Sequence, residues 1–166
     1  MQPSPHISSG PVRQSLALLG FVAACLAVGG LGGAMTTPEI AGWYATLAKP
    51  SFNPPNWIFG PVWTTLYILM AVAAWLVWRR GGWRDAQPAL LLFALQLLLN
   101  CAWSLLFFGL HRVGVALVDI AVLLVTIAAT ALAFRPYSAT AAFLLVPYLA
   151  WVCFATVLNF AIWRLN

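Results

Sequence analysis

Residues 43–67 read WYATLAKPSFNPPNWIFGPVWTTLY and interrupt a chain that is otherwise apolar enough to lie in lipid. They include seven aromatic residues and four prolines. Because proline lacks a backbone donor and fixes φ, residues 50–61 cannot form one regular helix. Stiff aromatic rings that lead directly into a helix are compatible with a lid over a flat apolar ligand. An aromatic belt at the membrane interface is the interpretation that composition alone favours.

The composition indicates an integral membrane protein. Of the 166 residues, 63% are hydrophobic and 7% are charged, and the mean hydropathy is +0.93. A soluble domain carries about 25% charged residues, so this chain could not cover itself against water. The net charge of +5 comes from basic residues near the ends of the apolar runs. Membrane topology therefore explains the charge, and no nucleic-acid partner is expected.

Five apolar runs are long enough to cross a bilayer as helices, at about residues 15–36, 61–79, 88–109, 113–134 and 138–163. Residues 1–14 are expected to be a loose tail, and residues 37–60 a loop between the first two spans. Pro147 should kink the last helix, because it cannot donate to the carbonyl of Phe143. The predicted fold is an all-α membrane protein. Its one domain, residues 15–166, is a bundle of five transmembrane helices with a long aromatic and proline-rich loop between helices 1 and 2.

The distribution of basic residues predicts the orientation. An odd number of spans places the two termini on opposite sides of the membrane. One side receives five basic residues and the other three: Arg13, Arg79, Arg80, Arg84 and Arg135 against Lys49, Arg112 and Arg164. The positive-inside rule then places the N-terminus in the cytoplasm and the aromatic loop outside.

Aromatic and amide side chains recur at spacings of three and four residues on three predicted helices, which stacks them in stripes. The stripes are Trp63, Tyr67, Met70, Ala74 and Trp78; Gln96, Asn100, Trp103 and Phe107; and Tyr148, Trp151, Ala155 and Asn159. Amides are unfavourable in lipid, so the stripes should face the interior. Converging rings with a few polar atoms suit a large planar ligand. Core packing with amides that bridge helices is the alternative.

Asp119 is the one acid deep within a predicted span, where a charge costs on the order of 2.5–3.5 kcal/mol. Because no base lies in the spans, a structural hydrogen bond explains it better than a proton route. His6 and His111 lie at the membrane edge, so stacking and not histidine ligation would hold a haem or porphyrin. The sequence shows no metal cluster, phosphate loop or nucleophile with its base, and its three cysteines lack CxxC spacing.

Three strings together resemble the TspO/MBR family of tryptophan-rich sensory and translocator proteins, also called peripheral-type benzodiazepine receptors. They are WYATLAKPSFNPPNWIFGPVWTTLY from Trp43, QLLLNCAWSLLFFG from Gln96 and VPYLAWVCFATVLNFAIWRLN from Val146. The resemblance is to a bacterial member and covers nearly the whole chain. It implies an uncleaved first span, although Arg13 and the following apolar run would also fit a signal peptide.

The resemblance also implies a pocket under the loop between helices 1 and 2. Family members bind protoporphyrin IX and haem there, and also lipophilic drug-like ligands or sterol. By motif, ten positions would form this pocket: Tyr44, Pro54, Trp63, Gln96, Asn100, Trp103, Tyr148, Trp151, Phe154 and Ala155. Trp63 and Trp151 would point their indole N–H groups at the polar atom of the ligand, where no water competes. Porphyrin or haem is expected as a ligand and not as an obligatory cofactor, and no metal site is expected.

Three functions remain open at this point. The first is a tetrapyrrole-binding sensory or carrier protein. The second is an enzyme that degrades porphyrin in light and oxygen by electron or radical transfer from Trp63 and Trp151. The third is a structural or scaffolding membrane protein. The resemblance does not decide between an inner and an outer membrane.

The chain departs from the family pattern in two places. Leu91 and Leu95 replace the GxxxG dimer seam of some members, which leaves a homodimer possible but its interface open. Phe160 replaces the tyrosine of a cholesterol motif, so cholesterol is not assigned as the physiological ligand.

Overall fold

The computed structural model describes residues 10–166, which contain helices and short connections and no β-strand. In chain order the elements are α1 (Pro11–Ala41), α2 (Trp43–Thr46), η1 (Asn56–Ile58), α3 (Phe59–Asp85), α4 (Gln87–Ser104), the π-helix η2 (Leu105–Gly109), α5 (Val113–Phe134), α6 (Ala139–Leu144) and α7 (Val146–Leu165). Within the described range, five helical stretches are long and apolar enough to cross a membrane. The predicted all-α fold with five membrane-spanning helices is therefore confirmed.

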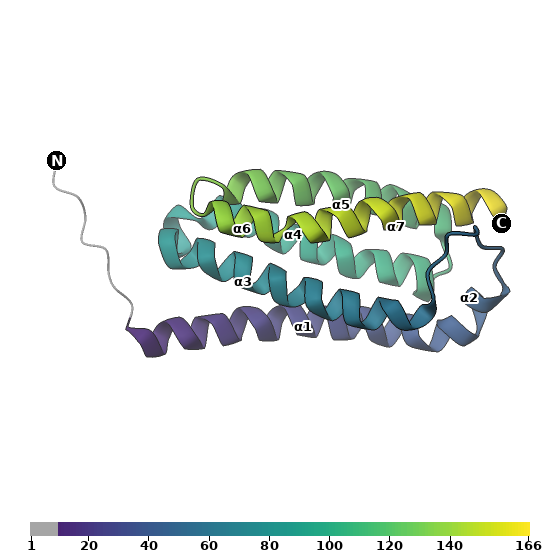
Figure 1. Cartoon of the computed structure of the whole chain (residues 1–166), viewed down its shortest axis with the longest axis horizontal. Helices are drawn as coiled ribbons and strands as arrows, with labels where there is room; N and C mark the ends of the chain where they lie inside the picture. The colour runs from purple at the N-terminus through teal and green to yellow at the C-terminus, as the bar shows by residue number, and fades with distance from the viewer. Residues whose placement is uncertain (1–9) are drawn as a thin grey trace.

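The long helices lie side by side in one elongated bundle (Figure 1). Helix α1 packs on α3 and α4, α3 packs on α6, and α5 packs on α4, α6 and α7. This arrangement closes a ring of helices around the interior. Helix α1 is the most exposed member, since 11% of the residues in its most apolar stretch are buried, against 28–39% in the other spans. Helix α1 therefore exposes a larger share of its residues than any of the other four spans does.

The first helix is longer than predicted at both ends. It begins at Pro11, so residues 11–14, which were assigned to the tail, form its first turn. Residues 1–9 of the predicted tail lie outside the described part of the chain. The proline at the start is tolerated because the first N–H groups of a helix have no partner within it.

At its other end α1 continues through Pro38 to Ala41, so the predicted start of the loop at residue 37 was wrong. The fixed φ of proline is compatible with a helix, and only one backbone bond is lost. The hydroxyls of Thr36 and Thr37 each donate to a carbonyl one turn earlier at 2.8 Å, which adds hydrogen bonds in the same turns. The connection between the first two spans is thus residues 42–58, and it contains α2 and η1.

Glycine and proline set two further boundaries. The second span was predicted to end at about residue 79. Its helical conformation does break at Gly82, with φ 63°, but a further helical turn follows to Asp85. The last span breaks at Leu145, between α6 and α7, and Pro147 lies in the first turn of α7. The predicted interruption by Pro147 is therefore confirmed.

Gly29 lets α1 approach α3 closely. A Cβ atom at this position would lie 2.6 Å from two carbon atoms of the Tyr67 ring, a distance that packed side chains do not adopt. A Cβ at the neighbouring Gly30 would meet nothing within 4 Å. The two glycines therefore offer a matched comparison of a tight contact with an open position.

We expect Gly29→Ala to destabilise the protein by about 1–3 kcal/mol, because the added methyl group overpacks the contact with Tyr67. Gly30→Ala should leave stability unchanged or raise it by about 0.5–1 kcal/mol, because alanine favours the helix. Thermal unfolding in detergent micelles measures both changes. Equal unfolding temperatures for the two variants would contradict the close approach.

Candidate functional site

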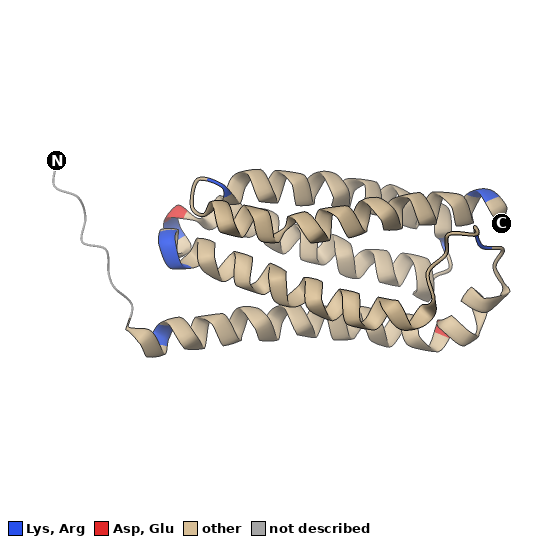
Figure 2. Cartoon of the chain, viewed as in Figure 1, with Lys and Arg blue, Asp and Glu red and all other residues tan. Residues whose placement is uncertain are grey.

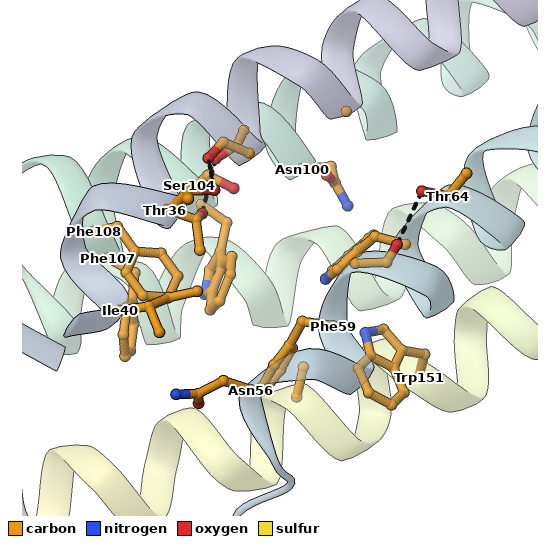
Figure 3. Close-up of a pocket in the computed structure, with 18 of the residues that line it drawn as sticks. Thr36, Ile40, Asn56, Phe59, Thr64, Asn100, Ser104, Phe107, Phe108 and Trp151 are labelled. Atoms are coloured by element: carbon orange, nitrogen blue, oxygen red, sulfur yellow. Dashed lines mark hydrogen bonds between the residues drawn. The ribbon is translucent and has the colours of Figure 1, made fainter. Parts of the chain in front are cut away.

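A cavity of about 440 Å³ lies within the bundle beside the connection 42–58. Its wall is formed by residues of α1, α2, η1, α3, α4, η2 and α7, and Figure 3 shows part of it. The volume falls within the range of small-molecule sites, about 300–1,000 Å³. Every described residue that lines the cavity is uncharged. The cavity therefore suits the electrically neutral body of a ligand.

Seven of the ten predicted pocket residues line the cavity: Tyr44, Trp63, Asn100, Trp103, Trp151, Phe154 and Ala155. The other three do not. Pro54 lies in the connection beside the cavity, and its carbonyl accepts a hydrogen bond from the side chain of Asn53 at 3.2 Å. Gln96 and Tyr148 are fully buried in the packing of the bundle. None of the three lines this cavity, and their role in ligand binding stays a prediction.

The amide of Asn100 joins three spans at the wall of the cavity. Its Oδ1 accepts a hydrogen bond from the hydroxyl of Tyr67 on α3 at 2.5 Å, and its Nδ2 donates to the hydroxyl of Tyr148 on α7 at 2.9 Å. Buried amides are stable only when they are paired in this way. Asn100 is thus largely committed to the fold.

A second amide, Asn159, has a similar role. Its Oδ1 accepts from the indole N–H of Trp103 at 3.0 Å, and its Nδ2 donates to the carbonyl of Val113 at 3.0 Å. These bonds connect α7 to α4 and to the start of α5. The predicted alternative, in which amides bridge helices, is therefore correct for both asparagines, and it coexists with the cavity.

Aromatic rings line two sides of the cavity. The ring of Trp63 lies 5.7 Å from that of Tyr67, and the ring of Trp151 lies 6.0 Å from Phe59 and 5.5 Å from Phe154. Figure 3 shows Trp151 and Phe59 side by side. Unlike Trp103, neither Trp63 nor Trp151 donates its indole N–H to any described residue. Two strong donors thus remain free beside the cavity.

Tyr44 closes the cavity from the side of the connection and is 5% exposed. Its hydroxyl donates to Asn53 Oδ1 at 2.7 Å, and Lys49 Nζ lies 4.8 Å from the centre of its ring. Burial raises the pKa of this phenol, so the hydroxyl stays protonated and keeps its role as a donor at neutral pH. The sequence reasoning did not find Asn53, because an asparagine in a loop is an ordinary turn residue.

Two further contacts fasten the connection to α7. The side chain of Asn166 accepts from the backbone N–H of Ala48 at 3.0 Å and donates to the Ala48 carbonyl at 3.1 Å. The ring of Phe52 packs edge-on against Phe154, with the ring centres 6.4 Å apart. We call residues 42–58 with these contacts the cap. Ala48 and Phe52 attach the cap to Asn166 and Phe154, and the Tyr44–Asn53 bond joins two parts of the cap to each other.

The sequence reasoning also missed the contribution of α1. Its lining residues are Leu26, Gly29, Gly30, Gly32, Gly33, Thr36, Thr37 and Ile40. The glycine-rich run 29–33 was the available signal, because small residues let the backbone of another helix approach closely. The close approach is real at Gly29, but other glycines of this run leave open space in the wall.

His111 lies nearer to aromatic rings than expected. Its imidazole stacks on Trp43 with ring centres 4.1 Å apart, and its Nε2 lies 3.1 Å from Glu39 Oε2. Neither His111 nor Trp43 lines the cavity. His6 lies outside the described residues.

Asp119 lies on α5, which contributes no residue to the lining of the cavity. Its Oδ2 atom is buried and has no hydrogen-bond partner among the described residues. The structural hydrogen bond predicted for Asp119 is therefore not made by this oxygen.

The fold and the cavity define a multi-pass α-helical membrane protein with an aromatic internal cavity. Residues 21–164 match the model of the TspO/MBR family, and the chain belongs to that family. The resemblance carried by the three sequence strings is thereby confirmed.

Similar proteins occur in bacteria and animals. The tryptophan-rich protein TspO of Chlorobaculum tepidum is 48% identical over 157 residues, which cover 93% of this chain and 98% of that protein. The translocator protein of Homo sapiens is 48% identical over 126 residues, 75% of each chain. The tryptophan-rich sensory protein of Cereibacter sphaeroides is 42% identical over 148 residues, 89% of this chain and 90% of that protein.

We expect Asp119→Asn to leave the affinity for a ligand of the cavity nearly unchanged, because Asp119 does not line it. The same change should not raise the unfolding temperature, because the amide that replaces the buried carboxyl group would also lack a hydrogen-bond partner. Ligand titration and thermal unfolding of the two proteins measure these effects. A large loss of affinity would instead indicate a functional role for this carboxyl group.

Proposed function

We propose that the protein is a membrane receptor or carrier that binds a tetrapyrrole, protoporphyrin IX or haem, in the aromatic cavity. The observation that carries this proposal is a neutral, ring-lined cavity with two free indole donors, Trp63 and Trp151. Flat aromatic walls favour a planar apolar body through stacking. The names of the relatives, a sensory protein and a translocator protein, support sensing or carriage over a purely structural role.

The charges around the cavity support one orientation of the ligand. The carboxylates of a porphyrin would be costly inside a cavity without a cation. Lys49 lies over the ring of Tyr44, which lines the cavity at the cap. Figure 2 shows further basic residues at this end of the bundle, which includes Arg164 near the C-terminus. The macrocycle would therefore lie inside, with its carboxylates directed towards the cap.

Neutral lipophilic molecules fit the same cavity. Such a ligand places no charge among the rings and needs only an acceptor atom near Trp63 or Trp151. Drug-like ligands or a sterol would therefore compete with the porphyrin for one site.

We expect Trp63→Phe and Trp151→Phe each to weaken protoporphyrin binding by about two- to tenfold, because each removes a hydrogen bond worth about 0.5–1.5 kcal/mol. Trp57→Phe is the matched control, since Trp57 is 74% exposed and does not line the cavity. Quenching of tryptophan fluorescence by added protoporphyrin IX measures the affinities. Absence of saturable binding in the unaltered protein would favour the structural or scaffolding role instead.

A light- and oxygen-dependent porphyrin-degrading enzyme is the second candidate, because both indoles that it needs line the cavity. Illumination of the protein–porphyrin complex in air separates the two functions. If the Soret band is lost with the unaltered protein but retained with Trp63→Phe, the protein degrades the porphyrin. A stable band together with quenched tryptophan fluorescence would demonstrate binding alone.

We further propose that the N-terminus lies in the cytoplasm and the cap on the opposite side. Basic residues gather at the end of the bundle away from the cap (Figure 2), where α1 begins and α3 and α5 end. The arginines in these parts of the sequence are Arg13, Arg79, Arg80, Arg84 and Arg135. Positively charged ends are retained in the cytoplasm. A reporter that is active only outside the cytoplasm should therefore be active when fused to the C-terminus. Activity of a cytoplasmic reporter at that position would reverse the orientation.

A further inference from the structure

Helices α1 and α3 are in contact at Gly29 and are separated nearer the cap. At Gly29 the backbone of α1 lies against the ring of Tyr67. Nearer the cap, Gly33 and Thr37 of α1 and Gly60 and Thr64 of α3 all line the cavity. The same four residues are exposed on the surface of the protein. A residue that both lines a cavity and is exposed marks an opening. Among the described residues, six of the seven that meet both conditions lie on α1 or α3, and one, Asn56, lies in the cap; the six are Leu26, Gly30, Gly33, Thr37, Gly60 and Thr64. The main opening of the cavity therefore lies sideways between α1 and α3.

In the described part of the chain, no side chain fills the space beside three glycines at this opening. A Cβ atom added at Gly30, Gly33 or Gly60 would meet nothing within 4 Å. The helix edges there consist of glycine backbone and the short side chains of Thr37 and Thr64. The contact of Gly29 with Tyr67 bounds the opening on the side away from the cap.

The edges of the opening are compatible with hydrocarbon. The hydroxyl of Thr37 donates to the carbonyl of Gly33 at 2.8 Å, and that of Thr64 donates to the carbonyl of Gly60 at 2.9 Å. Their hydrogen-bonding groups are thus satisfied within their own helices, as lipid requires. Both helices are among those that are long and apolar enough to cross a membrane, so we infer that the opening faces the bilayer.

We propose that this opening is a lateral portal through which a ligand dissolved in the bilayer enters and leaves the cavity. The portal consists of Gly30, Gly33 and Thr37 on α1 and Gly60 and Thr64 on α3. The proposal rests on the proposed function only in requiring that the cavity binds a lipophilic ligand.

The cap offers a less favourable route. Entry there would break the Tyr44–Asn53 hydrogen bond, both bonds between Asn166 and Ala48, and the packing of Phe52 on Phe154. Entry between the helices breaks none of these contacts. A planar ligand that partitions into lipid can therefore enter between α1 and α3 without breaking these contacts, whereas entry through the cap requires breaking them.

The test narrows the portal without altering the cap. Gly33→Phe and Thr64→Phe place a ring in the opening from each side. Gly20→Phe and Thr65→Phe are the matched controls. Gly20 lies on the same helix with open space around it, and Thr65 is an exposed threonine with its hydroxyl bonded to the Pro61 carbonyl at 2.9 Å. Neither control residue lines the cavity.

Stopped-flow fluorescence with protoporphyrin IX in phosphatidylcholine vesicles gives the association and dissociation rates. The portal variants should slow both rates together by about tenfold, equivalent to about 1.4 kcal/mol of added barrier, with the equilibrium affinity retained. The controls should behave like the unaltered protein. Asn166→Ala, which releases the cap, should leave the association rate unchanged.

Three results would overturn the portal. The first is equal rates in portal and control variants while the unaltered protein binds saturably. The second is a weaker affinity of the portal variants at an unchanged association rate, which would make these residues only part of the wall. The third is faster association in Asn166→Ala, which would place the entrance at the cap. Absence of binding by the unaltered protein would overturn the proposed function and the portal together.

Discussion

The amide of Asn100 is the interaction on which the cavity depends. This side chain is 4% exposed, and each of its polar atoms is bonded to a tyrosine hydroxyl of another span. This arrangement holds α3, α4 and α7 in register beside the cavity. It also removes Asn100 from the set of groups that are fully free to bind a ligand. The indole N–H groups of Trp63 and Trp151 remain, and both are donors.

The sequence predicted the five spans because length and hydropathy decide them almost alone. It did not predict their ends, since Pro38 continues a helix that composition would stop, and a helical turn follows the break at Gly82. Helical spacing also identified which face of each helix turns inward. It did not identify which residues of that face lie at the level of the cavity. Gln96 and Tyr148 share their faces with true lining residues, yet they lie fully buried in the packing of the bundle.

The parts of the site that sequence reasoning missed leave weak local signals. Asn166 bonds to Ala48 across 118 positions of the chain, and nothing near either residue indicates the pairing. Asn53 supports Tyr44 from a segment where asparagine is common for other reasons. Glycines of α1 contribute open space at the wall of the cavity, and a pattern of side chains along the sequence does not indicate such space. A cavity is a property of what neighbouring helices leave unfilled, so its outline follows from packing and not from the sequence of one helix.

The two boundaries of the cavity differ in a way that suits a ligand with an apolar body and polar arms. The cap is closed by hydrogen bonds and lies where water and basic residues are available, whereas the side between α1 and α3 is bordered by glycine and by threonines whose hydroxyls are already bonded. Gly60 is the second residue of α3, so the side opening extends close to the cap. Under the proposed function, a porphyrin would move its rings through lipid into the cavity while its carboxylates stay at the membrane surface. Such a path avoids transferring an unpaired charge into hydrocarbon, which is the largest energetic barrier to burying this class of molecule.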